Sequence, residues 1–182
     1  MENTENSQLE FVTLGGGCFW CTESVFQAVR GVSEVVSGYS GGHIENPSYE
    51  QICGGDTDHV EVVRIGFDPS VIDLQTILEI FFATHDPTSL NRQGADAGTQ
   101  YASVVFYETE QQKEVARKVM AQTQELLGRK LETRLEPAPK FWPAEDYHRD
   151  YYARHPQQGY CQMVISPKMA KLRQKFAPLL RT

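Results

Sequence analysis

The chain has 182 residues and a formal net charge of −7, and 40% of its residues are hydrophobic. This length predicts one compact domain with a substantial core, because a chain of this size buries about 70% of its unfolded surface. The acidic balance excludes a protein that acts mainly by neutralising phosphates, and no apolar run exceeds four residues, which excludes a membrane span. We therefore expect neither nucleic acid nor a membrane as a partner.

The first ten residues of the chain contain no recognisable targeting signal. MENTENSQLE has neither a basic region nor an apolar region, so no secretory or transit signal is predicted. Residues 1–8 are polar and are expected to be disordered, with a single domain over 9–182. Four cysteines are too few for a secreted disulfide scaffold, so we expect a cytoplasmic protein in which any disulfide is transient.

Hydrophobic periodicity in the first part of the chain predicts strands and helices in the order βαββαβ. These elements cover residues 9–17, 19–31, 34–39, 60–67, 73–85 and 101–107. Cys18 should lie at the N-terminus of the first helix, directly after a glycine turn. The two loops at 40–59 and 86–100 are too long to be passive connectors, so we expect them to build a site.

The second part of the chain predicts a helix that begins with the N-cap Thr109 and stops at Gly128. The elements after it are a strand at 131–137, a helix at 144–155, a short strand at 160–166 and a last helix that carries Met169, Leu172, Phe176 and Leu179. The last helix has apolar residues at helical spacing and is expected to dock with a solvated basic face. Helices and strands without strict alternation favour an α+β fold, a two-layer sandwich with a mixed sheet.

The strongest local signal is GGGCFWC at residues 15–21. Backbone N–H groups and the dipole of the helix stabilise a thiolate at a helix N-terminus, so we expect a lowered pKa for Cys18 and a nucleophilic role. The CxxC pair favours redox chemistry, with a structural or zinc-binding role as the alternative. Zinc would need further ligands from Cys53, His59 or Cys161. The sequence gives this little support, so we expect no metal and no cofactor, and Cys53 is expected to be a small buried thiol.

Two large aromatic residues, Phe19 and Trp20, follow Cys18 directly. Adjacent helix positions point about 100° apart, so both side chains cannot face the same core. One of them should line the space in front of Cys18 and form an apolar wall suited to a group such as a methyl.

A series of motifs runs along most of the chain. They are GGGCFW (15–20), GYSGG (38–42), NPSYEQIC (46–53), GDTDHVEVV (55–63), HDPTS and NRQGADAGTQY (85–101), FWPAEDYH (141–148) and GYC (159–161). In this order they resemble the peptide-methionine (S)-S-oxide reductase family, the A-type methionine sulfoxide reductases. The resemblance covers residues 10 to 161 and implies the family's two-layer sandwich, with a core related to ferredoxin-like topology.

The resemblance implies thiol-dependent reduction of the S epimer of methionine sulfoxide, free or in oxidised proteins. It implies that Cys18 is the nucleophile and Glu61 the catalytic acid. The implied substrate-binding residues are Phe19 and Trp20 at the methyl group, Tyr49 and Tyr101 at the sulfoxide oxygen, and Asp96 at the pocket edge. On the pattern alone, Glu61 would be a solvent-facing strand residue and the two tyrosines ordinary half-buried aromatics.

This chemistry explains the residue types. A sulfoxide sulfur becomes electrophilic when its oxygen is protonated, so the reaction needs an acid with a raised pKa. Attack leaves Cys18 as a sulfenic acid. A second thiol then condenses with it to form a disulfide, and the resemblance implies that thioredoxin reduces this disulfide by thiol–disulfide exchange.

The second thiol is where the sequence departs from a common family pattern. Many members place resolving cysteines in a flexible C-terminal coil, whereas here GYC continues into a predicted strand and helix. Cys21 is one helical turn from Cys18, so we expect Cys21 to resolve the sulfenic acid, with Cys161 as the alternative. His148 is expected to support the site or to lie at the surface. A thioredoxin-like disulfide oxidoreductase and a zinc-stabilised binding module are the competing functions.

Overall fold

The computed structural model describes residues 8–181 of the chain. The predicted disordered segment, residues 1–8, therefore lies almost entirely outside the described residues. The strands are β1 (Glu10–Gly16), β2 (Val32–Ser40), β3 (Val60–Phe67), β4 (Arg92–Gln93), β5 (Asp96–Ala97), β6 (Ser103–Tyr107), β7 (Arg134–Pro137) and β8 (Phe141–Pro143). The helices are α1 (Phe19–Gln27), α2 (Tyr49–Cys53), α3 (Leu74–Thr84), α4 (Glu110–Leu127), α5 (Tyr151–Arg154) and α6 (Ser166–Phe176).

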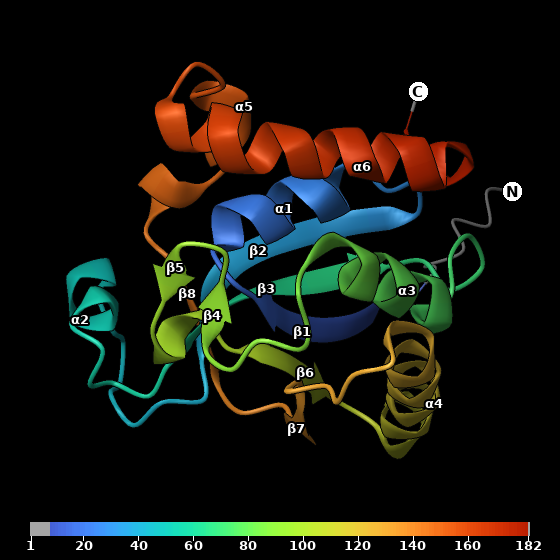
Figure 1. Ribbon diagram of the computed structural model, residues 1–182. Coiled ribbons are helices and arrows are strands. Elements are labelled where there is room, and N and C mark those ends of the chain that lie inside the picture. Colours follow the sequence, from blue (N-terminus) through green and yellow to red (C-terminus); the bar gives the residue numbers. More distant parts are fainter. Residues whose placement is uncertain (1–7, 182) are drawn as a thin grey trace, which may run out of the picture.

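A six-stranded sheet forms one layer, in the order β7-β6-β1-β3-β2-β8. Its neighbouring strands are antiparallel, except that β6 and β7 are parallel. Figure 1 shows α1, α3, α4 and α6 on one side of this sheet, where they form the second layer. The predicted α+β two-layer sandwich is confirmed. No helix within residues 8–181 has both the length and the apolar character needed to cross a membrane.

Alternation along β3 decides which side chains meet the helices, because successive strand residues point to opposite faces. Val60 and Val62 pack in a small cluster on one face, whereas Val63 and Ile65 belong to the main core beneath the helices. Glu61 lies two residues before Val63 and therefore points to the same face of the strand, toward the helical layer.

The glycine turn between β1 and α1 positions Cys18. Gly17 has a positive φ of 95°, and a Cβ added there would lie 2.7 Å from the Gln93 side chain, so the turn requires glycine. Cys18 follows as the extended N-cap residue of α1, with φ −60° and ψ 127°. Its predicted place at the helix N-terminus is confirmed.

The signals at both ends of α4 are also confirmed. The Thr109 side chain accepts a hydrogen bond from the Gln112 N–H, and Gly128 ends the helix in the left-handed conformation with φ 64°. Local capping chemistry therefore fixes both boundaries of this 18-residue helix.

Both long loops contain short elements that the sequence analysis did not predict. Loop 40–59 holds α2, which begins with a capping box made by Ser48 and Gln51. Loop 86–100 holds the hairpin of β4 and β5, and a 3-10 turn at Thr99–Tyr101 follows it. In Figure 1, α2 and the hairpin lie on the side of the molecule where α1 begins.

The predicted strand at 160–166 is wrong. Residues Cys161–Ile165 form a wide π-helical turn, η3, which continues directly into α6. The side chains of Cys161, Ile165, Met169 and Leu172 are all buried, and their spacing is helical. The whole segment packs on α1, and its buried residues recur at the spacing of a helix. This packing decides the structure, although the short stretch 160–166 alone has the alternation of a strand.

The predicted helix at 144–155 is only partly correct. It divides into a 3-10 turn at Asp146–His148 and the single turn α5, because Asp150 between them is left-handed with φ 53°. Directly before it, β8 pairs with the edge of β2, and this strand was not predicted. The docked last helix is confirmed, with Met169 and Leu172 buried.

Candidate active site

A carboxyl group lies directly beside the first cysteine of the CxxC pair. The backbone N–H of Phe19, the residue after Cys18, donates a hydrogen bond of 3.2 Å to Oε1 of Glu61. Only 1% of Glu61 and 9% of Cys18 is exposed. The solvent-facing position that the strand pattern alone predicts for Glu61 is therefore wrong, because β3 points this residue at the start of α1.

The Glu61 carboxyl is suited to hold a proton at neutral pH. Burial raises its pKa to about 8, the charge of Asp96 adds to this effect, and the hydrogen bond from Phe19 opposes it. Its second oxygen, Oε2, is buried and has no hydrogen-bond partner within the described residues. A neutral carboxyl with one uncommitted oxygen can donate a proton to a group that binds next to Cys18.

The two aromatic residues after Cys18 point in different directions, as their spacing predicts. Phe19 is buried and packs against Tyr39 and His148, with ring centroids 5.6 and 4.9 Å apart. Trp20 is only partly buried and stacks on Tyr151 at 3.7 Å. The Trp20 indole N–H donates a 3.0 Å hydrogen bond to Nδ1 of His148. His148 thus orients Trp20 from within the protein, which is the supporting role expected for it.

The two long loops bring Tyr49 and Tyr101, the tyrosines that the family resemblance assigns to the sulfoxide oxygen, to the site around Cys18 and Glu61. Tyr49 begins α2 and its backbone N–H donates to Glu145 at 3.0 Å, while Tyr101 ends the 3-10 turn after β5. Both side chains are half-buried. Burial, followed by the charge of Glu61, raises the pKa of each hydroxyl. Both hydroxyls are therefore protonated at neutral pH and are close to the Glu61 carboxyl.

The pKa values of the Cys18 and Cys21 thiols depend on each other, and all four cysteines are free. Burial raises the pKa of Cys18 well above its ordinary value, and the hydrogen bond with Cys21 and the charge of Glu61 raise it further. The hydrogen bond from Cys18 lowers the pKa of Cys21 to about 7, against the effect of burial. The expectation of a lowered pKa at Cys18 is therefore wrong for this resting arrangement. Cys21 is therefore the more acidic thiol of the pair.

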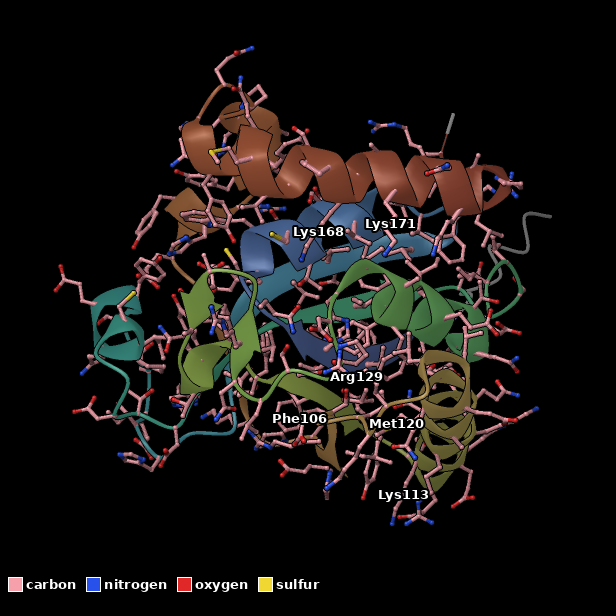
Figure 2. All side chains as sticks on the ribbon, viewed as in Figure 1. Phe106, Lys113, Met120, Arg129, Lys168 and Lys171 are labelled. Carbon is pink, nitrogen blue, oxygen red and sulfur yellow. The ribbon has the colours of Figure 1, made fainter. Side chains whose placement is uncertain are left out.

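Groups from distant parts of the chain surround Cys21. Its sulfur lies 3.7 Å from the Tyr160 hydroxyl, and that hydroxyl donates a 2.6 Å hydrogen bond to Oδ2 of Asp96. Lys168 lines a small cavity next to Cys21, and its charge lowers the pKa of this thiol. Figure 2 shows Lys168 on the side of α6 that faces α1. Tyr160 and Lys168 were not among the predicted site residues, although Tyr160 belongs to the GYC motif.

The other two cysteines occupy contrasting places. Cys161 is completely buried in η3, and burial followed by the charge of Cys21 raises its pKa. Cys53 is exposed on α2, which contradicts the expected small buried thiol, because the adjacent Ile52 takes the inward position. Within residues 8–181 no group of three His, Cys, Asp or Glu side chains could hold a metal ion, so the structure gives the zinc alternative no support.

Comparison with known proteins gives consistent results. The peptide methionine sulfoxide reductase family matches residues 10–179. Peptide methionine sulfoxide reductase MsrA of Chromobacterium violaceum is 57% identical over 175 residues, which cover 95% of this chain and 99% of that protein. Among solved structures, reduced Mxr1 from Saccharomyces cerevisiae has 33% identity and a TM-score of 0.79, with coverage of 88% of this chain and 95% of Mxr1. Mxr1 in complex with Trx2 has 22% identity and a TM-score of 0.56, covers 83% and 90% of the two chains, and is similar in fold.

We expect titration of the reduced protein, followed by thiolate ultraviolet absorbance, to show one thiolate that forms with a pKa of about 7. Cys21→Ser should remove this transition. Cys18→Ala should move it to higher pH, because Cys21 loses the hydrogen bond that lowers its pKa most. Cys53→Ser, at the exposed cysteine, is the control and should leave it unchanged. A transition that persists in Cys21→Ser and vanishes in Cys18→Ala would place the thiolate on Cys18 instead.

Proposed function

The chain belongs to the peptide methionine sulfoxide reductase family and is therefore an oxidoreductase acting on methionine sulfoxide, and from this premise we propose that it reduces the S epimer through a sulfenic acid at Cys18. The observation that carries the proposal is the hydrogen bond from Phe19 N–H to Glu61, since it holds a buried, protonated carboxyl beside the Cys18 thiol. The substrate is free or protein-bound, and the protein repairs methionine residues after oxidative stress.

The surrounding aromatic residues bind the substrate in this proposal. The methyl group of the sulfoxide lies against Phe19 and Trp20, which offer an apolar surface beside Cys18. Tyr49 and Tyr101 donate hydrogen bonds to the sulfoxide oxygen, because their hydroxyls keep their protons at neutral pH. Asp96 lies at the edge of the substrate site, and its charge keeps Glu61 protonated by raising its pKa.

The reductive step balances with the groups in place. Glu61 protonates the sulfoxide oxygen, and the Cys18 thiol gives its proton to the Cys21 thiolate with which it is hydrogen-bonded. The substrate S–O bond breaks, and the oxygen ends on the Cys18 sulfur. Cys18 loses two electrons, which reduce the substrate sulfur. The products are methionine, Cys18 sulfenic acid, the Glu61 carboxylate and the protonated Cys21 thiol.

Cys21 then resolves the sulfenic acid by forming a disulfide with Cys18. Cys21 lies one helical turn from Cys18 and its pKa responds to that thiol, whereas Cys161 is buried in a helical turn of a packed C-terminal segment. Thioredoxin is the proposed reductant of this disulfide; yeast Mxr1, a relative at 33% identity, has been found in complex with Trx2. We propose the cytoplasm as the location, where such a reductant keeps the thiols reduced.

The proposed activity is tested by reduction of the two separated epimers of a dabsylated methionine sulfoxide, with dithiothreitol as the reductant. We expect turnover of the S epimer alone. Cys18→Ser should abolish turnover, because no sulfenic acid can form, and Cys53→Ser should retain it. Full activity in Cys18→Ser, or preference for the other epimer, would contradict the proposal.

Glu61→Gln should slow methionine release in a single turnover by about 10²–10⁴-fold, because it removes the proton donor and keeps the shape. In the wild type this step should slow as the pH rises through about 8, since the protonated form of Glu61 is lost there. The variant should lack this dependence. Glu23→Gln is the matched control, because Glu23 is also buried and burial also raises its pKa, to about 7. A loss of less than about fivefold in Glu61→Gln would place proton donation elsewhere.

Cys21→Ser should release one methionine per enzyme and then stall with thioredoxin, because the sulfenic acid at Cys18 has lost its neighbouring thiol. Cys161→Ser should turn over almost normally. Peptide mapping after one turnover should find a disulfide between Cys18 and Cys21. A dominant disulfide between Cys18 and Cys161, together with a stalled Cys161→Ser, would show that the C-terminal segment unpacks during the reaction.

A further inference from the structure

The C-terminal helical segment supplies two polar groups to Cys21. Tyr160 directly precedes η3, and Lys168 lies two turns further along in α6. A third group, Asp96, comes from the hairpin within the second long loop. In proteins, π-turns often occur at functional sites. The segment predicted as a strand therefore brings a hydroxyl and a cation to the proposed resolving thiol.

The direction of the hydrogen bonds around Tyr160 depends on whether Cys21 carries a proton. The hydroxyl donates to Asp96 Oδ2 at 2.6 Å. In that arrangement its oxygen can accept a hydrogen bond from a protonated Cys21, whose sulfur lies 3.7 Å away. A protonated Cys21 donates to Tyr160, and Tyr160 donates to Asp96, so the chain of bonds leads from the thiol to a carboxylate.

The hydrogen bonds that link Cys21, Tyr160 and Asp96 become important after the reductive step. In the resting enzyme the largest influence that lowers the pKa of Cys21 is the hydrogen bond from the Cys18 thiol. That S–H group no longer exists once Cys18 is a sulfenic acid, and Cys21 has by then received a proton. Cys21 must lose this proton in order to attack, so it needs an acceptor other than Cys18.

Besides Cys18, the titratable groups around Cys21 are Glu61, His85, Asp96, Tyr160, Cys161 and Lys168. Within the described residues the Tyr160 hydroxyl is the group of this set that lies within hydrogen-bond contact of the Cys21 sulfur. Glu61, a carboxylate after the reductive step, is held on the Cys18 side by the Phe19 N–H. Burial lowers the pKa of His85 to about 4, and its ring nitrogens already bond to the Phe81 carbonyl and the Ser103 hydroxyl. Burial raises the pKa of Tyr160, so this hydroxyl stays neutral and passes a proton on rather than storing it. Asp96 is half-exposed and can exchange the proton with solvent.

We propose that Tyr160 is a catalytic residue of the resolving step, relaying the Cys21 proton to Asp96 while Lys168 stabilises the developing thiolate. This inference rests on the proposed function, in which Cys21 resolves the sulfenic acid. The Cys21 sulfur attacks the Cys18 sulfur, the S–S bond forms and the S–O bond breaks. The thiol proton moves to Tyr160 as Tyr160 gives its own proton to Asp96. Asp96 returns a proton through solvent to the departing hydroxide, so the products are one disulfide and one water.

Tyr160→Phe tests the proposal, because it removes only the relaying oxygen. The lifetime of the Cys18 sulfenic acid is measured by rapid quenching with dimedone and peptide mapping, alongside methionine release in the same single turnover. We expect methionine release to keep its rate and disulfide formation at neutral pH to slow by about 10²-fold. In this variant disulfide formation should accelerate with rising pH, because solvent must now accept the thiol proton.

Asp96→Asn should also slow disulfide formation, since an amide cannot take the proton that Tyr160 passes on.

Tyr152→Phe is the matched control. Tyr152 lies in the same C-terminal region, is half-buried, and its hydroxyl hydrogen-bonds to Ser166 at 2.8 Å. Its loss removes a comparable contact away from Cys21 and should leave disulfide formation unchanged.

The outcomes separate this inference from the proposed function. A wild-type rate and pH profile of disulfide formation in Tyr160→Phe would overturn the relay alone and leave Cys21 as the resolving thiol. A disulfide between Cys18 and Cys161 in the wild type would overturn the resolving role of Cys21 and the relay with it. If disulfide formation slows equally in Tyr160→Phe and Tyr152→Phe, the role of Tyr160 is structural and the relay is contradicted.

Discussion

The hydrogen bond between the Phe19 N–H and Glu61 is the constraint on which the rest of the site depends. A buried carboxyl is costly to ionise, so enclosing Glu61 under the start of α1 keeps it protonated. The same contact fixes the first turn of α1 against β3, which places Cys18 next to the carboxyl. The nucleophile and the acid are therefore positioned together, because one backbone group of the helix holds one side chain of the sheet.

The CxxC turn divides the chemistry between two sides of α1. Cys18 faces Glu61 and lies near Tyr101. Cys21 faces the C-terminal segment with Tyr160 and Lys168. The acid for the first step and the proton acceptor proposed for the second are thus separate groups. This separation means that the proton that Glu61 donates in the first step and the proton that Cys21 loses in the second step move through different groups.

The outer parts of the site are held by polar groups that do not touch the thiols. His148 accepts the hydrogen bond of Trp20, and Glu145 accepts bonds from the Tyr39 hydroxyl and the Tyr49 backbone. Both residues belong to the segment after β8, so the pairing of β8 with β2 also sets the position of the aromatic wall. A rigid wall limits the orientations in which a substrate can approach Cys18.

The sequence by itself determined the elements that rest on local signals. Examples are α4 with its Thr109 cap and Gly128 stop, the strand Val60–Phe67, and Cys18 at the start of a helix behind glycines. The motifs also identified the family, because ordered residues along the chain carry that information without coordinates. Only the tertiary structure decided the burial of Glu61, the helical state of residues 161–165 and the placement of Tyr160 and Lys168 at Cys21. It also reversed the expected direction of the pKa shift of Cys18, since pKa values depend on burial and on neighbours far apart in the chain. Periodicity describes the pattern of residues within one segment. Burial, pKa values and the neighbours of a side chain depend instead on the other segments that pack against it.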